Sequence, residues 1–119
     1  MLGLKMTLDE LAKEIRSVSD EKLIQELAKY IEEWKGDDRN ASALETMVER
    51  FFGIVWIPEE EDHSKAYNLW SSFRDDAIHG IGGMTMNERL YAFGLFERFD
   101  SCKSEAEELV VYGKVHAKP

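Results

Sequence analysis

The stretch TLDELAKEIRSV, residues 7–18, contains the pattern that decides the fold class. Thr7 and Glu10 have the spacing of a capping box, in which each side chain accepts a bond from the other residue's backbone N–H at a helix start. Behind them, apolar residues recur three and four positions apart, as on one face of an α-helix. These residues are Leu8, Leu11, Ala12, Ile15 and Val18.

The same pattern recurs along the chain. Three more times, a serine or threonine is followed three positions later by glutamate, ahead of a run with helical spacing. No stretch alternates like a strand. The sequence therefore predicts an all-α fold, a single domain over residues 1–119 built as a bundle of five to six helices. The three further boxes are Ser42 with Glu45, Thr85 with Glu88, and Ser104 with Glu107.

The helix boundaries between these boxes follow from caps and breakers. Ser19 is expected to cap a second helix, which Gly36 then ends in the left-handed conformation. A third helix is expected from Ser42 until Pro58, with Trp56 at the edge of its apolar face. The acidic residues that follow form either a loop or the first turn of a fourth helix.

The second half of the chain predicts the centre of the bundle. Gly80 is expected to close the fourth helix. A fifth helix, from Thr85 to Phe99, is apolar on nearly every side and should be the central one. The last helix has its apolar stripe at Ala106, Leu109 and Val110, with Lys114 near its C-terminal end. Three side chains of the fifth helix should be nearly inaccessible: Leu90, Phe93 and Phe96.

Composition restricts the classes of partner. The net charge of −9 disfavours binding to a phosphate backbone or an anionic membrane and favours a basic protein. A role of this charge in solubility alone is the alternative. The single cysteine, Cys102, excludes an internal disulfide and a multi-cysteine zinc site. Residues 1–6 are too short for the apolar part of a signal peptide, and no run of about 18 apolar residues occurs, so we expect a cytoplasmic protein.

No residue pattern indicates catalysis. A nucleophilic site needs a serine or cysteine with a base and an orienting group, and the sequence marks none. The glycines between Gly80 and Gly83 precede a helix, but the lysine of a phosphate loop is missing. We therefore expect no cofactor, no metal and no enzymatic activity.

Two acidic clusters are candidates for a partner-binding surface. The first consists of Glu59, Glu60, Glu61 and Asp62, together with Asp75 on the polar face of the following helix. Trp56 lies beside it, and an aromatic residue flanked by acids is a suitable anchor for a basic protein surface. Solvated charge is the alternative for both clusters. The second cluster is Glu32, Glu33, Asp37 and Asp38.

In length, acidity and helical architecture, the whole chain resembles the helical immunity proteins of bacterial toxin systems, those of contact-dependent inhibition and colicins. The resemblance implies a protein that neutralises a basic, nuclease-like toxin by charge-complementary occlusion. Trp56, Glu59, Glu60, Glu61, Asp62 and Asp75 would then meet lysine and arginine residues of the toxin. The alternative is a helical adaptor whose apolar groove holds a partner helix, or a homodimer through the same surface.

Overall fold

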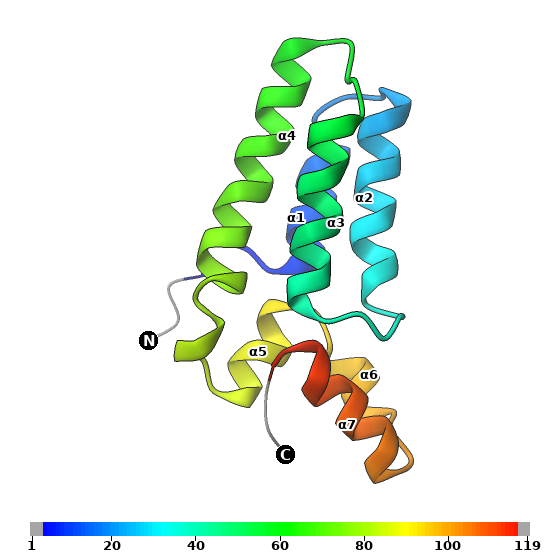
Figure 1. Cartoon of the computed structure of the whole chain (residues 1–119), viewed down its shortest axis with the longest axis vertical. Helices are drawn as coiled ribbons and strands as arrows, with labels where there is room; N and C mark the ends of the chain where they lie inside the picture. Colours follow the sequence, from blue (N-terminus) through cyan, green and yellow to red (C-terminus); the bar gives the residue numbers. More distant parts are fainter. Residues whose placement is uncertain (1–3, 117–119) are drawn as a thin grey trace.

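The computed structural model describes residues 4–116. Four helices run antiparallel, up and down, and three further helices lie across one end of them (Figure 1). Within the described residues no strand occurs and seven α-helices form, which confirms the all-α prediction and exceeds the predicted five to six helices. None of these helices is long and apolar enough to cross a membrane. The four antiparallel helices are α1 (Leu8–Arg16), α2 (Lys22–Trp34), α3 (Ala41–Ile54) and α4 (Glu60–Phe73).

A wider helical turn extends α4. Residues Arg74–Ile78 form a π-helical turn, in which the N–H of His79 donates to the carbonyl of Arg74, five residues back, at 2.9 Å. Gly80 follows, where a Cβ would lie only 2.4 Å from the backbone oxygen of Asp76. Glycine therefore fits where the chain leaves the helix, as predicted. A short 3-10 turn, Ile81–Gly83, then leads to the C-terminal helices.

The C-terminal helices are α5 (Met86–Ala92), α6 (Phe96–Asp100) and α7 (Glu105–Lys114). The prediction of one central helix from Thr85 to Phe99 is wrong. Gly94 separates α5 from α6 with a φ of 67°, a left-handed conformation that glycine adopts without strain. Both pieces lie beneath the bundle rather than inside it (Figure 1).

Two of the three side chains predicted to be inaccessible are buried. Leu90 and Phe93 are in the core, where Phe93 packs against Trp34 and Phe73 at ring centroid distances of 5.6 and 5.7 Å. Phe96 is 42% exposed, so the prediction for that residue is wrong. The break at Gly94 changes the direction of the chain and places Phe96 on the surface.

The helix starts show which predicted caps form. Both reciprocal bonds are present for Thr7 with Glu10 and for Thr85 with Glu88. Ser104 accepts from the N–H of Glu107, as predicted. The returning bond goes to a neighbour, because the carboxylate of Glu107 accepts from the N–H of Lys103.

The predicted caps of α2 and α3 are wrong. Glu21 caps α2, accepting from the N–H of Leu23 at 2.5 Å, while Ser19 accepts only from the N–H of Glu21. Asn40 caps α3 by accepting from the N–H of Ala43 at 2.8 Å. Asparagine is among the strongest N-caps, and it precedes Ser42 by two residues, so the helix begins earlier than predicted.

Two helix ends also differ from prediction. Gly36 follows α2 without adopting positive φ, since among described glycines only Gly94 does. On α7, Leu109 of the predicted apolar stripe is 49% exposed, whereas Val111 and Val115 are buried. The helix is rotated so that Lys114 is also fully buried.

Candidate protein-binding surface

The connection between α3 and α4 forms the end of the bundle opposite to α5, α6 and α7 (Figure 1). α3 ends at Ile54, four residues before Pro58, because Val55 is already extended with φ −84° and ψ 131°. Side chains of an extended segment point alternately to opposite sides. Here Ile57 is buried and anchors the connection, while its neighbours Trp56 and Pro58 are exposed.

Two large apolar side chains protrude from this connection. Trp56 is 80% exposed and Ile54 is 76% exposed, the highest values among the large hydrophobic residues of the described chain. Trp56 was expected at the edge of a helix face. It lies instead on an extended segment, held by buried Ile57. We call Ile54 and Trp56, with the acidic residues 59–62, the tip.

The acidic block of the tip forms the start of α4. Glu59 is the N-cap residue without a side-chain capping bond, and Glu60, Glu61 and Asp62 occupy the first turn, where the helix dipole favours negative charge. Glu61 pairs with Lys65 at 3.0 Å and raises the pKa of that lysine. Among the residues described, Glu59, Glu60 and Asp62 form no ion pair.

The second acidic cluster behaves differently, because its carboxylates are paired within the chain. Glu32 pairs with Arg16, and this bond lowers the pKa of Glu32. The remaining carboxylates have partners as well, so this cluster offers fewer free charges to another protein than the tip does. Those pairs are Glu33 with Lys29, Asp37 with Arg39 and Lys114, and Asp38 with Arg98.

A hollow of about 630 Å³ lies at the tip, with Trp56, Ile54 and Glu60 among its lining residues. Aromatic rings support it from below. Phe52 packs edge-on against His63 at 5.4 Å and against Tyr67 at 5.0 Å. Because these rings join α3 to α4, the hollow has a packed floor, and Glu60 is the acidic residue of its lining.

Asp75 does not belong to the tip. It lies in the π-helical turn, thirteen residues after Asp62, which corresponds to about 20 Å along a helix. Its carboxylate accepts from Arg74 at 3.0 Å and lies 3.5 Å from His79, which also contacts Glu45 at 2.9 Å. Within residues 4–116, no group of three or more histidine, cysteine or acidic side chains is arranged to hold a metal ion.

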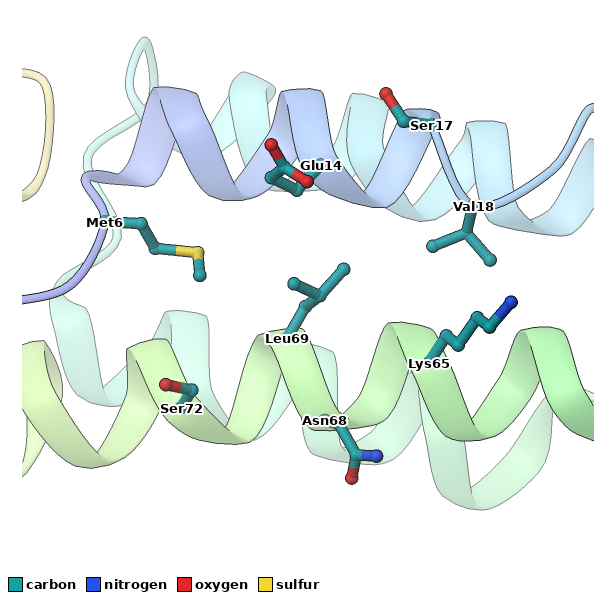
Figure 2. Close-up of a pocket in the computed structure, with 8 residues that line it drawn as sticks. All are labelled: Met6, Glu14, Ser17, Val18, Lys65, Asn68, Leu69 and Ser72. Carbon is teal, nitrogen blue, oxygen red and sulfur yellow. The ribbon is translucent and has the colours of Figure 1, made fainter.

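A second depression, of about 490 Å³, runs between α1 and α4. Figure 2 shows Val18 and Leu69 pointing toward each other across it, with Met6 closing one end. Ser17 and Asn68 point away from the gap, and Lys65 pairs with Glu61 of its own helix rather than with Glu14, so the polar groups at its edge do not converge on one point (Figure 2). Ligand sites usually combine an apolar wall with a few converging polar groups, and this depression lacks the second feature.

No protein-family model, curated protein or solved structure matches this chain. The tip must therefore be interpreted from its own chemistry. Sequence reasoning singled out Trp56 and the four acidic residues, but it missed Ile54 and the half-exposed Tyr30 nearby. The signal for Ile54 was its place directly after Gly53 and off the helical stripe that contains Phe51 and Val55.

Proposed function

We propose that this chain is an immunity-type protein, which binds and neutralises a basic, nuclease-like bacterial toxin in the cytoplasm without catalysing a reaction. One observation carries the proposal: the most exposed large aromatic residue of the described chain, Trp56, stands beside carboxylates that have no intramolecular partner. A nuclease needs lysine and arginine to hold its substrate's phosphates. The tip has the complementary charge.

The two parts of the tip have different roles in this proposal. Glu59, Glu60 and Asp62 attract the basic surface over several ångströms and accelerate encounter, an effect that salt screens. Trp56 then becomes desolvated against the partner and slows dissociation, as aromatic anchors at interface centres do. The packed floor beneath the hollow lowers the entropic cost of binding, because little rearrangement is needed.

Reversing two of the three unpaired charges at the start of α4 should slow association. We expect Glu59→Lys combined with Glu60→Lys to lower the association rate constant at least about tenfold at low salt. We expect the binding partner to be a nuclease-like toxin domain encoded beside this gene, and stopped-flow tryptophan fluorescence follows the reaction. Cells that express the reversed variant should also lose protection against that toxin.

A matched control is available on the C-terminal helices. Asp100→Lys combined with Glu105→Lys changes the net charge equally, and Glu105, like Glu60, is an exposed first-turn residue of its helix. This variant should associate within about twofold of wild type. If both variants slowed association equally, the overall charge of the protein, and not the tip, would account for the effect. An unchanged rate in the tip variant, or the lack of protection by wild type, would contradict the proposed function.

A further inference from the structure

An apolar groove lies between α2 and α3, next to the tip. It has a volume of about 220 Å³, which is enough for one or two large aliphatic side chains. All of its lining residues are apolar or aromatic except Arg50. Ile54 and Val55 line both this groove and the hollow at the tip, so the two depressions adjoin. The groove is lined by Leu27, Tyr30, Met47, Val48, Arg50, Phe51, Ile54 and Val55.

The walls of the groove are held in place by the core. Leu27 and Val48 form its floor and are buried. Tyr30, 40% exposed, packs edge-on against Phe51 at 6.3 Å and joins the α2 wall to the α3 wall. An apolar depression with fixed walls and an exposed rim is typical of sites that receive side chains of another helix.

The length of the groove agrees with such an occupant. From Met47 to Ile54, where α3 ends, the α3 wall covers seven residue steps, about 10.5 Å. Two apolar residues at positions i and i+7 of a partner helix also lie about 10.5 Å apart. Two turns of an amphipathic helix would therefore fill the groove.

Charge selects among possible occupants. A second copy of this chain also carries a net charge of −9, and two such copies would repel one another. A helix with lysine and arginine beside its apolar stripe would instead be attracted to Glu59 and Glu60 at the end of the groove. Arg50, the one charged lining residue, lies on the α3 wall and favours an acceptor at that position of the helix.

We propose that the partner inserts a basic amphipathic helix into the α2–α3 groove, with its apolar stripe against Tyr30 and Phe51 and its cationic end at the tip. This inference rests on the proposed function, because it names the element that the basic partner presents. It also divides the kinetic roles: the acidic residues of the tip govern association, and the groove adds to Trp56 in slowing dissociation.

Two synthetic peptides test the groove on the full-length protein. Both have 18 residues of leucine, lysine and alanine, with identical composition; one has a leucine stripe at helical spacing and the other is scrambled. Titration followed by amide chemical shifts should show the striped peptide binding at least about tenfold more tightly. The shifts should include Tyr30, Phe51 and Ile54. Equal affinity of the two peptides, or shifts confined to residues 56–62, would overturn the proposal.

A single substitution separates the groove from simple charge attraction. Tyr30→Glu adds a negative charge that would strengthen a purely electrostatic complex, yet it removes the apolar wall. We expect it to raise the dissociation rate constant of the striped peptide at least about tenfold, at low and at high salt. Leu109→Glu is the control, since Leu109 is a similarly exposed helix residue on α7, and it should change the rate less than twofold.

The outcomes distinguish failure of the groove from failure of the proposed function. If the charge reversal at Glu59 and Glu60 slows association of both peptides but Tyr30→Glu has no effect, the groove proposal is wrong and the acidic tip is supported. If Tyr30→Glu acts but charge reversal does not, the groove stands and the charge-steered function is contradicted. No binding of either peptide at about 1 mM, where even a weak interface of about 4 kcal/mol would be half-saturated, contradicts both.

Discussion

Replacing Lys114 by methionine is expected to lower the free energy of unfolding by about 3–5 kcal/mol, as removal of one partner from a buried charged pair does. Lys114 is fully buried near the end of α7. Its Nζ donates to the carbonyl oxygens of Trp34 at 2.5 Å, Asp37 at 2.7 Å and Arg39 at 2.8 Å. Methionine keeps the apolar stem but leaves these acceptors without a donor.

Two further contacts strengthen this expectation. The ammonium lies 3.1 Å from the Asp37 carboxylate and 3.8 Å from the centre of the Trp34 ring, a cation–π distance. Arg98 of α6 donates to the carbonyl oxygens of Lys35 and Asp37 in the same connection. Cations from α6 and α7 thus hold the α2–α3 connection and attach the C-terminal helices to the bundle.

Urea denaturation of wild type and variant measures the effect. Lys29→Met is the control, because Lys29 is an exposed helical lysine whose nearest carboxylate, that of Glu33, is 3.9 Å away. Its loss should change stability by no more than about 0.5 kcal/mol. If Lys114→Met were as mild as this control, the buried cation would contribute nothing to the attachment of α7.

The stability difference between wild type and Lys114→Met should grow with pH. Burial lowers the pKa of Lys114 from 10.5 to about 8, and the bond to Asp37 offsets only part of this shift. Between these two values the unfolded chain binds a proton that the folded chain has released. Wild-type stability therefore rises with pH in this window, by up to about 1.4 kcal/mol per pH unit.

Unfolding experiments at pH 7, 8.5 and 9.5 check this dependence. Other lysines and tyrosines titrate in both proteins, so their contributions cancel in the difference between wild type and variant. Below pH 8, Lys114 is charged in both states and the difference should be constant. A difference that shrinks as pH rises would show that the folded environment favours the charged amine instead.

Lys114 also shows why sequence reasoning found the helix but not its packing. A lysine in the last turn of a helix is expected in solvent, where it meets the negative dipole end. Its acceptors are mostly backbone carbonyls of residues 75 to 80 positions earlier. The pattern of side chains in a sequence does not indicate where such carbonyls will lie. The same rotation of α7 buries Val111 and Val115 and exposes Leu109.

Capping patterns in the sequence predicted the bonds correctly where the partners are close in sequence. Thr7 and Glu10 cap each other because both groups belong to one helical turn. Ser42 and Glu45 have the same spacing, but their side chains bond residues that are distant in sequence instead of capping the helix. Ser42 bonds His116 at 3.1 Å, and Glu45 bonds His79 at 2.9 Å. A capping box predicts a helix start only if no stronger cap stands nearby.

The tip was partly predictable for a related reason. The four consecutive acidic residues after Pro58 were predicted to form either a loop or a helix start, and the structure shows the second, with Glu59 as the N-cap residue of α4. Asp75 was grouped with them because helical periodicity defines a face and ignores position along the axis. The sequence suggested an apolar groove only as an alternative and could not place it, because Tyr30 and Phe51 meet only when α2 and α3 are packed together.

The second large effect is expected at the junction of α5 with the bundle, where Phe93→Ala should cost about 3–5 kcal/mol. Phe93 is fully buried, and it contacts Trp34 of α2 and Phe73 of α4. Its removal would leave a cavity between three helices whose backbones are fixed by other contacts, so the surroundings can relax only partly.

Phe96 provides the matched control, because it is the same residue type three positions further along and is 42% exposed. Phe96→Ala removes a ring with few core contacts and should cost less than about 1.5 kcal/mol. Urea unfolding of both variants compares a buried ring with a surface ring on either side of Gly94. If Phe93→Ala cost less than about 1 kcal/mol, α5 would not be joined to the core through this ring. If both substitutions cost about 3–5 kcal/mol, the break at Gly94 would be misplaced. The continuous helix from Thr85 to Phe99, with both rings buried, would then describe the chain better.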